Sequence, residues 1–312
     1  MGFMIDHWDF NASPATQQAL DASPMQTNHW YHCERMNPEL RDWLLDNNIP
    51  DSTVDHLLAD ETRPSFHQYD ADNFMLILRG INMNSNDTPE NMLSVRILYY
   101  NGILISTRKI PSRSILEIRQ SLEKQHGPQD LSELLLQIID GLSNKIDLYL
   151  EDIDAAINAF DITDSDTHDA IDTQKALLRI KRFIRPQLYA IRDFSESETS
   201  LMLQHEHHAH YALNNITRIN ETIDFYLGEL DLMRDEIRHL HDEQVNQNSY
   251  LFTVVAAIFL PTSFLTGLLG INIGGIPGTE DSSAFLWFCL GLLVIFGAEI
   301  WLLRYLKFFN KN

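Results

Sequence analysis

Two apolar runs near the C-terminus constrain the fold of this chain more than any other feature. The first extends from Tyr250 to Leu269 and the second from Ala284 to Leu303. Each run contains about 20 residues, the length that a helix needs to cross a bilayer. The glycine-rich connection between them has only about a dozen residues, too few to form a domain. The sequence therefore predicts a transmembrane helical hairpin, with spans at about 249–270 and 284–304.

Charge predicts the orientation of this hairpin. The connection, residues 272–283, contains no Lys or Arg and carries Glu280 and Asp281, whereas the tail after the second run is basic. The positive-inside rule then places both termini in the cytoplasm and the short connection outside. Residues 1–10 have neither the basic nor the apolar segment of a signal peptide. We therefore expect the part of the chain before the membrane to be cytoplasmic.

Composition disfavours several functions. The formal net charge of −21 argues against nucleic acid and against docking on anionic lipid. It suits either attraction of cations or a merely soluble acidic surface. The two cysteines, Cys33 and Cys289, lie in the soluble part and in the second run, so we expect neither a disulfide nor a thiolate zinc site within one chain. The sequence has no nucleotide-binding fingerprint, zincin motif or nucleophile elbow, so we expect no enzyme and no bound cofactor.

The soluble part begins with a mixed α/β pattern over residues 29–125. Strand-like runs occur at 73–81, 92–100 and 103–108. Asn101-Gly102 is a strong hairpin signal between the last two runs. Helical segments are predicted after Pro38 and over 115–124, and residues 1–28 are polar enough to be expected irregular.

From Asp130 onward the pattern is helical. Amphipathic helices are predicted over 131–160 and 166–194. A third helix begins near Thr199 or further along and continues into the first apolar run, because no stop signal separates them. Its apolar positions are spaced alternately by three and four, a heptad seam that must be buried against its own domain or against identical neighbours. The seam consists of Ile216, Ile219, Ile223, Tyr226, Leu230, Met233, Ile237 and Leu240.

A second stripe follows the same helix through the first span. It consists of small or polar residues with one leucine among them: Asn246, Ser249, Thr253, Ala256, Leu260, Ser263, Gly267 and Gly270. Such a stripe either packs closely against another helix or lines water. Its continuation into the stalk through Asp242, His239 and Asp235 favours water, because a packing seam does not normally carry carboxylates. A single hairpin cannot enclose a pore, so a water-lined stripe requires several copies around one axis.

The segment His205–His210 is rich in histidine, a composition typical of metal binding. On a helix His207 and His210 are three residues apart and could share one ion with Glu206. A solvated loop or helix end is the simpler alternative. His239 either faces the water-lined stripe, where it would titrate near neutral pH, or packs within the stalk.

Gly270-Ile271-Asn272, at the end of the first span, resembles the Gly-Met-Asn signature of the CorA superfamily of divalent-cation transporters, with Ile271 in place of Met. Pro261 matches the mid-span proline of that superfamily. The connection and four soluble motifs resemble its ZntB zinc-transporter branch. These motifs are Glu61-Thr62-Arg63-Pro64, Leu78-Arg79-Gly80-Ile81-Asn82, Ser94-Val95-Arg96 and Ile105-Ser106-Thr107-Arg108. The chain is similar to that branch over nearly its whole length.

The resemblance implies a homopentameric funnel. Each subunit would have an α/β N-terminal cytoplasmic domain of the α/β/α sandwich type (residues 1–165), a helical stalk (166–248), and a transmembrane hairpin with a short basic tail (249–312). Motif match makes Gly270, Ile271 and Asn272 the outer selectivity ring. Ser263, Leu260 and Asn246 become narrower rings below it, and Asp242 and Asp235 face the funnel. Glu280 and Asp281 would attract cations at the outer mouth.

The implied function is transport of Zn2+ across a bacterial inner membrane through a pore lined by the first span, with proton coupling left open. One alternative is a Mg2+, Co2+ or Ni2+ channel of the same superfamily. The other is a non-conducting, tail-anchored oligomeric sensor or scaffold. A scaffold would gain nothing from polar residues on one face of its span, so the stripe favours transport.

Overall fold

The computed structural model describes residues 2–21, 23–85, 87–160, 166–202, 205–271, 278 and 281–305. The chain separates into two compact units, residues 1–234 and 235–312. The division falls inside the predicted stalk. The domain boundaries expected after residues 165 and 248 stay predictions.

The first unit is built on a seven-stranded sheet with strand order β2-β1-β3-β7-β6-β5-β4. Only β3 and β7 pair in parallel, and the other neighbouring strands are antiparallel. The strands are β1 (Met4–Asp9), β2 (Thr16–Gln17), β3 (His29–Glu34), β4 (Ser65–Asp70), β5 (Asn73–Gly80), β6 (Leu93–Tyr100) and β7 (Ile103–Arg108). The predicted hairpin is confirmed between β6 and β7, where Asn101 and Gly102 have φ of 48° and 79°. Positive φ at both central residues is what a tight hairpin turn of this hand requires.

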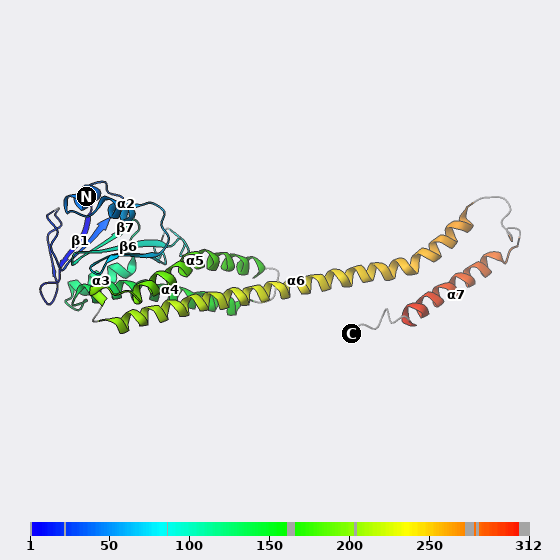
Figure 1. Cartoon of the computed structure of the whole chain (residues 1–312). Coiled ribbons are helices and arrows are strands. Elements are labelled where there is room, and N and C mark those ends of the chain that lie inside the picture. Colours follow the sequence, from blue (N-terminus) through cyan, green and yellow to red (C-terminus); the bar gives the residue numbers. More distant parts are fainter. Residues whose placement is uncertain are drawn as a thin grey trace. The chain divides into compact units, whose positions relative to one another are not determined.

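Helices cover both faces of this sheet, so the predicted α/β/α sandwich is confirmed (Figure 1). One face carries α1 (Glu39–Asp46) and α2 (Asp51–Leu58). The other carries α3 (Arg113–Glu123), α4 (Leu131–Ala159), α5 (Asp166–Ser195) and the beginning of α6 (Glu206–Gly270). A short 3-10 helix, Ser200–Met202, precedes α6. Each face has its own apolar core, with Leu40 and Val54 in one and Ile138 and Ile216 in the other.

Local capping fixes where α4 begins. The Oδ1 atom of Asp130 accepts a hydrogen bond from the backbone N–H of Glu133 at 2.8 Å. The carboxylate of Glu133 in turn accepts from the backbone N–H of Gln129 at 2.7 Å. This reciprocal arrangement satisfies N–H groups that a helix start leaves unpaired. The helix predicted from residue 131 therefore starts directly after its N-cap residue, Asp130.

The prediction that residues 1–28 are irregular is wrong, because β1 and β2 lie within them. Strand β1 pairs with β3, and Trp8 is 2 % exposed. Two polar residues in β1, Asp6 and His7, obscure the strand pattern, yet both are buried. Each has a partner: the carboxylate of Asp6 lies 3.0 Å from Arg119 Nε, and His7 Nε2 lies 2.9 Å from His29 Nδ1. Tertiary partners thus override the polar appearance of the strand.

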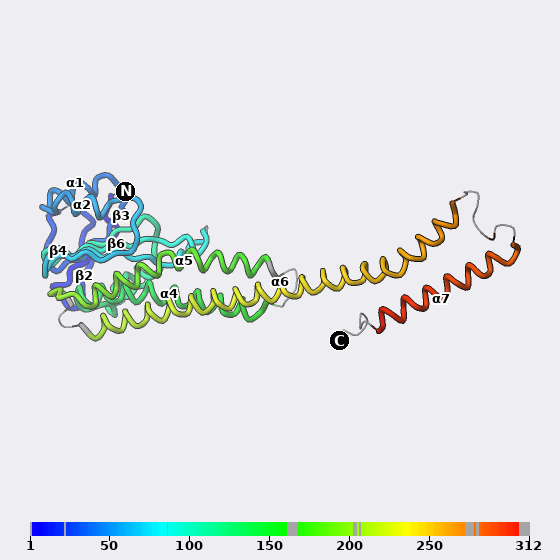
Figure 2. Tube along the Cα trace, turned by 45° about the vertical axis from the view of Figure 1, so that its right-hand side comes forward, coloured from blue at the N-terminus to red at the C-terminus, as the bar shows by residue number. Residues whose placement is uncertain are grey.

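The heptad seam of α6 is confirmed in the first unit. Ile216, Ile219, Ile223, Tyr226 and Leu230 are all buried in the core beneath the sheet. In both ribbon views α4, α5 and the beginning of α6 run side by side (Figures 1 and 2). The seam therefore packs α6 against its own domain over this stretch. Further along, Leu240 is exposed.

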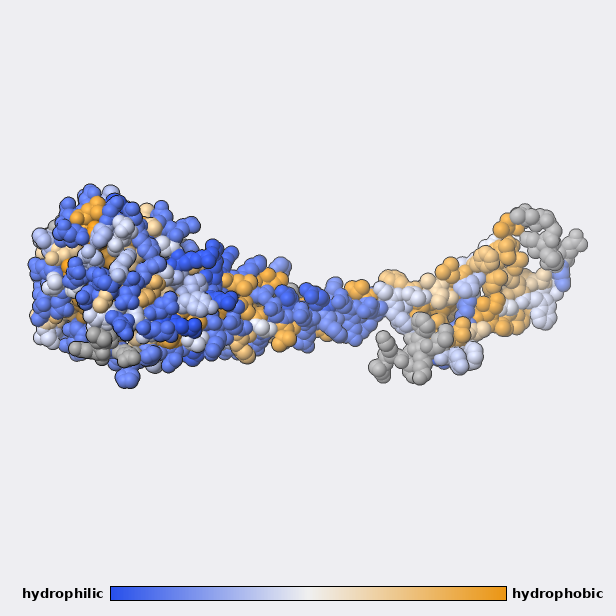
Figure 3. Space-filling view, in the orientation of Figure 1, coloured by the Kyte–Doolittle hydropathy of each residue, from blue (hydrophilic) through white to orange (hydrophobic). Residues whose placement is uncertain are grey.

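The second unit contains the end of α6 and α7 (Ala284–Tyr305). Helix α6 has no break between its stalk and its apolar part, as predicted. Both helices are long and apolar enough to cross a membrane. Their side chains are largely exposed within the single chain, and apolar surface dominates this stretch (Figure 3). Exposed apolar helices of this length are stable in hydrocarbon rather than in water.

Candidate functional site

The seam and the small polar stripe lie on opposite sides of α6. At about 100° per residue, Ile237 of the seam points roughly 200° away from Asp235 of the stripe. The seam side is the one that is buried in the first unit, whereas Gly228 and the pair Asp231 and Leu232, either of which can continue the stripe backwards, are exposed. The buried side and the polar side of this helix are therefore distinct surfaces.

Every predicted stripe residue is exposed in the single chain. These residues are Asp235, His239, Asp242, Asn246, Ser249, Thr253, Ala256, Leu260, Ser263, Gly267 and Gly270. All of them belong to one uninterrupted helix. The chain thus carries a continuous open strip of small, polar and acidic groups.

The stripe is a strict seven-residue pattern, and this has a geometric consequence. A seven-residue repeat drifts by about 20° per heptad around a straight helix. From Asp235 to Gly270 the drift amounts to roughly 100° over five heptads. The stripe can face one axis along its whole length only if several helices wind around that axis with a left-handed tilt.

The hydroxyl groups of Thr253, Thr262 and Thr266 in the apolar stretch of α6 donate to backbone carbonyls. Thr253 Oγ1 donates to the carbonyl of Ser249 at 2.8 Å, and Thr266 Oγ1 lies 3.0 Å from the carbonyl of Thr262. A hydroxyl that donates its proton to the helix needs no other acceptor in an apolar surrounding. Its oxygen keeps lone pairs that can accept hydrogen bonds. On the stripe, Thr253 can therefore offer an acceptor to a cation or to its hydration water.

Pro261 lies inside α6. A proline has no backbone N–H, so the carbonyl of Ala257, four residues earlier, lacks its helical donor. Thr262 Oγ1 donates to the neighbouring carbonyl of Ile258 at 3.2 Å. The carbonyl oxygen of Ala257 therefore receives no regular helical hydrogen bond, and it lies next to the stripe residue Ala256.

The predicted selectivity ring lies at the end of the described part of α6. Gly270 is the last helical residue, and Ile271 follows with 46 % of its surface exposed. Asn272 lies outside the described residues, as does Glu280. Asp281 is described, and its carboxylate accepts hydrogen bonds from the backbone N–H and the hydroxyl of Ser283 at 2.9 and 2.8 Å. These bonds lower the pKa of Asp281, so it stays ionised just before α7.

Acidic residues of the stalk are partly paired with basic neighbours on the same helix. Arg234 Nη2 lies 3.0 Å from Asp231 Oδ1, and Arg238 Nη1 lies 3.5 Å from Asp235 Oδ1. Such exposed pairs one turn apart contribute little to stability. Asp242 and His239 are exposed as well. The stalk stripe is consequently acidic, although intrahelical pairs partly balance its charge.

The histidine-rich segment makes contacts that its sequence did not indicate. His205 Nε2 lies 3.8 Å from Asp130 Oδ2, and the rings of His205 and His208 are 5.8 Å apart. The predicted pair, His207 and His210, is exposed. Among the residues that the structure describes, no three His, Cys, Asp or Glu side chains are grouped to hold a metal ion. Metal binding by His207 and His210 therefore stays a prediction.

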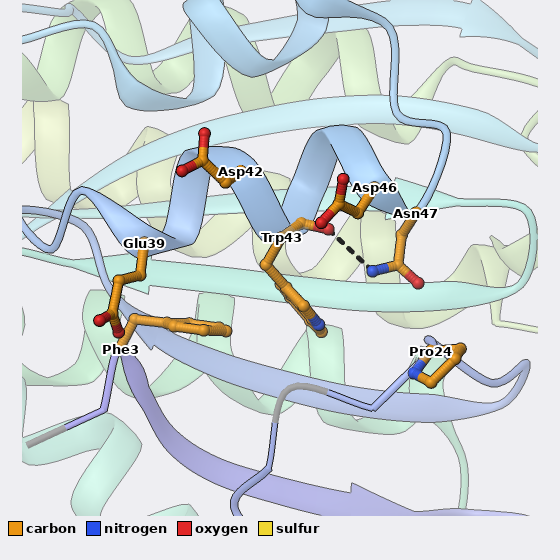
Figure 4. Close-up of a pocket in the computed structure, with 7 residues that line it drawn as sticks. All are labelled: Phe3, Pro24, Glu39, Asp42, Trp43, Asp46 and Asn47. Atoms are coloured by element: carbon orange, nitrogen blue, oxygen red, sulfur yellow. Dashed lines mark hydrogen bonds between the residues drawn. The ribbon is translucent and has the colours of Figure 1, made fainter.

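A hollow of about 380 Å³ lies beside α1 in the first unit (Figure 4). Phe3 and Trp43, whose ring centroids are 5.1 Å apart, form part of its wall. Glu39, Asp42 and Asp46 lie along the same helix at its rim. The hollow is thus an acidic surface depression in the α/β domain, separate from the stripe on α6.

Two features of the structure were missed from sequence. Large apolar residues, Tyr211, Phe225 and Leu232, are 64, 66 and 72 % exposed on α6. Their spacing of fourteen and seven residues was a signal, because heptad positions share a helix face. The second feature is a group of buried arginines in the sheet. Its signal was an arginine inside an apolar strand, as in Arg96 of β6.

The chain has an α/β/α domain, a long unbroken helix, α6, whose C-terminal part is apolar, and a second apolar helix, α7. This combination defines a membrane protein with a large soluble domain. A family profile described as "CorA-like Mg2+ transporter protein" matches residues 25–305 of this chain. The chain therefore belongs to the CorA-like family of divalent-cation transporters, as its sequence indicated.

Relatives and solved structures agree with this assignment. The chain is 64 % identical over 312 residues to the zinc transport protein ZntB of Vibrio parahaemolyticus, covering 100 % of this chain and 99 % of that protein. A crystal structure of the ZntB cytoplasmic domain from V. parahaemolyticus is 62 % identical, with a TM-score of 0.76 over 78 % of this chain and 100 % of that one. The full-length CmaX structure is 25 % identical, with a TM-score of 0.82 over 98 % of both chains. The similarity thus includes the soluble domain and the C-terminal helices.

Proposed function

We propose that this chain forms a homopentamer that transports Zn2+ across a bacterial inner membrane through a central pore lined by α6. The observation that carries the proposal is the open polar stripe, which passes from the apolar part of α6 into the acidic stalk without a break. The identity of 64 % to a zinc transport protein supports zinc as the cargo. Both termini would be cytoplasmic, following the charge of the flanking segments.

Self-association is supported by the apolar residues that α6 leaves exposed. Leu232 lies seven residues before His239, and Phe225 and Tyr211 lie seven and twenty-one residues before Leu232, so these side chains share the heptad position of His239. Side chains of this size at heptad spacing are typical of helix–helix contacts. Copies of α6 around a common axis would cover these apolar groups against one another and would place the polar stripe on the same axis. The proposed ring therefore accounts for both the exposed apolar residues and the polar stripe.

The conduction chemistry follows from the stripe. Asn272 side chains from all subunits would offer amide oxygens to a hydrated ion without a fixed charge, so that the ion can be selected and released. Glu280 and Asp281 would concentrate cations at the outer mouth, and Asp242 and Asp235 would do so on the cytoplasmic side. Leu260 would form an apolar constriction that gates by excluding water. The chain itself performs no covalent chemistry in this scheme.

The test is uptake of Zn2+ by liposomes that contain the purified full-length chain, with and without a proton gradient. Parallel assays with Mg2+, Co2+, Ni2+ and Cd2+ distinguish zinc transport from a magnesium-type channel. Asn272→Ala should abolish flux while the oligomer persists, and Thr279→Ala in the same connection serves as the matched control. Absence of Zn2+ flux both with and without the proton gradient would overturn the transport proposal. Unchanged flux in Asn272→Ala would remove the selectivity role of Asn272.

A further inference from the structure

Glu299 is an ionisable residue inside the second apolar helix. No other Asp, Glu, Lys or Arg occurs in residues 284–303. Glu299 lies five residues before Arg304, which places it about 7.5 Å further along the helix axis into the membrane than that basic residue. Trp301 and Tyr305, whose ring centroids are 5.5 Å apart, are typical interfacial anchors at the same end of α7. A carboxyl group at this depth is costly and is usually functional.

The side chain of Glu299 lies on the face of α7 that is shielded within the single chain. Most side chains of α7 are exposed, but a series of partly shielded positions recurs every four or three residues. This spacing is that of one face of a helix. The series comprises Ala284, Phe288, Leu292, Ile295, Glu299 and Leu303, and Leu303 is only 8 % exposed. Glu299 therefore belongs to a contact face rather than to the open side of α7.

Helix α6 carries a matching series in its apolar part. Val254 is 8 % exposed, and the partly shielded positions that follow it have the same spacing: Ile258, Thr262 and Leu265. Both ribbon views show α7 running back beside the end of α6 (Figures 1 and 2). Facing positions of two antiparallel helices advance in opposite directions, so matching the two series places Leu265 near Phe288 and Val254 near Glu299. Glu299 is thereby directed at an apolar stretch of α6.

The carboxyl group of Glu299 is poorly satisfied there. Its Oε2 atom is buried and has no hydrogen-bond partner among the residues that the structure describes. The ionisable groups next to it in that part of the chain are Tyr250, one turn before the facing position on α6, and Arg304 and Tyr305, which point about 140° and 120° away on α7. Cys289 lies about 15 Å further along α7. None of these groups places a positive charge on the contact face. Burying an ionised carboxylate without a partner is far costlier than burying its neutral acid.

The contact face of α6 lies opposite its polar stripe. At about 100° per residue, Val254 points roughly 160° away from Ala256, and Ile258 stands in the same relation to Leu260. Helix α7 therefore packs behind the side of α6 that carries the stripe. In the proposed ring Glu299 does not touch the ion in the pore. It acts on transport only through the position of α7 against α6.

We propose that Glu299 is a proton-binding site that controls the contact between α7 and α6. The protonated carboxyl group is neutral and fits the apolar contact, so α7 stays packed on α6. Release of the proton to water at the basic end of α7 leaves a carboxylate that must be hydrated, and the two helix ends then separate. Because α6 also carries the polar stripe, this step changes the pore near Thr253 and Ala256. The effect on transport rests on the proposed function, whereas proton binding does not.

Chemical labelling tests proton binding directly. The full-length chain in liposomes is treated with dicyclohexylcarbodiimide, an apolar reagent that adds to protonated carboxyl groups, and mass spectrometry locates the adduct. We expect the reagent to label Glu299 at near-neutral pH, at which exposed carboxyl groups are ionised, and the yield should fall as the pH is raised. Glu236, which is exposed on the stalk, is the internal control and should stay unlabelled. Absence of the adduct on Glu299 at near-neutral pH would overturn the proposal, whether or not the chain transports Zn2+.

Transport tests the coupling between the proton and the pore. Uptake of Zn2+ by liposomes is measured with equal pH on both sides, and the wild-type rate should change at least about threefold between about pH 5.5 and about pH 8. Glu299→Gln keeps the size of the side chain but cannot ionise. It should therefore keep, at every pH, the rate that the wild type reaches at the lowest pH.

Glu236→Gln is the matched control and should keep the wild-type pH profile. Size-exclusion chromatography in detergent verifies that both variants keep the oligomer. A wild-type pH profile in Glu299→Gln, or a wild-type rate that does not vary with pH, would refute the coupling. Failure of every chain to transport Zn2+ would instead overturn the proposed function, and the labelling result would still decide whether Glu299 binds a proton.

Discussion

Arg218 on α6 donates two parallel hydrogen bonds to Asp147 on α4. Its Nη1 lies 3.0 Å from Oδ1 and its Nη2 lies 2.7 Å from Oδ2. These hydrogen bonds raise the pKa of Arg218 above its ordinary value. The neighbouring seam residues Ile216 and Ile219 are buried in the core. A bidentate pair thus flanks the apolar contact that attaches α6 to its domain.

A double-mutant cycle with Arg218→Met and Asp147→Asn should give a coupling free energy of about 0.5–1 kcal/mol. The value is modest because Arg218 is 56 % exposed and water screens the pair. High salt should reduce it. The measurement is denaturant unfolding of the full chain in detergent. Lys175 and Asp172, which are 60 and 71 % exposed, are the control pair and should couple less. Equal coupling for both pairs would show that bidentate geometry adds nothing.

The ion pair between Asp6 and Arg119 behaves differently, because its carboxylate is buried. Asp6 on β1 is 1 % exposed and lies 3.0 Å from Arg119 Nε on α3. Burial raises the pKa of Asp6 from 3.8 to about 6, although Arg119 and Arg108 act to lower it. The cost of burying the carboxylate therefore exceeds the attraction of its partners.

The contribution of Asp6 to the free energy of unfolding should consequently fall as the pH rises from about 4 to about 6. In this window the folded chain holds a proton on Asp6 that the unfolded chain has lost, so the free energy of unfolding decreases with pH. A shift from 3.8 to about 6 corresponds to roughly 3 kcal/mol. Asp6→Asn should remove this loss and gain stability relative to wild type by that order between pH 4 and pH 7.

Asp9→Asn is the matched control in the same strand. Burial acts to raise the pKa of Asp9, but hydrogen bonds from Asn11 and the charge of His29 outweigh it and lower the pKa. The ionised form of Asp9 therefore favours folding, and its contribution is lost as the pH falls through its folded pKa. Relative to wild type, Asp9→Asn should lose stability as the pH rises. A common trend for Asp6→Asn and Asp9→Asn would refute these assignments.

Apolar periodicity was enough to predict the elements that carry the core. Strands β5, β6 and β7 are apolar runs separated by turn signals, and α4 and α5 have clear helical spacing. Strand β4 was missed because it lies at the sheet edge with an exposed, polar sequence. Strand β1 was missed because Asp6 and His7 are buried polar residues whose partners come from other elements. The sequence pattern of one strand does not show which side chains of other elements will contact it.

The candidate site was predictable to a similar extent. The stripe on α6 follows from heptad spacing alone, and the structure confirms that its residues share one continuous, exposed helix. The proximity of Arg35, Arg79 and Arg96 was not predictable, because Arg79 and Arg96 lie in β5 and β6, Arg35 directly follows β3, and only the sheet register brings these segments together. In sequence, Arg79 and Arg96 contributed only to the family resemblance.

A side chain at Gly80 is expected to be destabilising. A Cβ atom added there would lie 2.6 Å from Leu142 Cδ2, and Leu142 is only 2 % exposed. Gly80→Ala should lower the free energy of unfolding by about 1–3 kcal/mol, because the packed core must shift. The companion change Leu142→Val, which removes the clashing group, should restore part of this loss. Gly228→Ala is the control and should be neutral or stabilising, since Gly228 lies in open space within α6.

Enlarging a stripe residue should block transport, whereas enlarging a residue on another face should not. Ala256 belongs to the stripe, and Val255 points about 100° away from it on α6. In the proposed ring every subunit presents Ala256 to the axis, so Ala256→Leu adds bulk once per subunit at one level of the pore. Val255→Leu adds volume to a surface that lies away from the stripe.

Liposome uptake of Zn2+ measures the difference. Ala256→Leu should reduce the rate at least tenfold, and Val255→Leu should leave it within about twofold of wild type, since the first narrows the pore and the second changes only an apolar contact. Size-exclusion chromatography in detergent verifies that both variants keep the oligomer. If both variants transported alike, the stripe would not line the pore, and close helix packing would become its explanation.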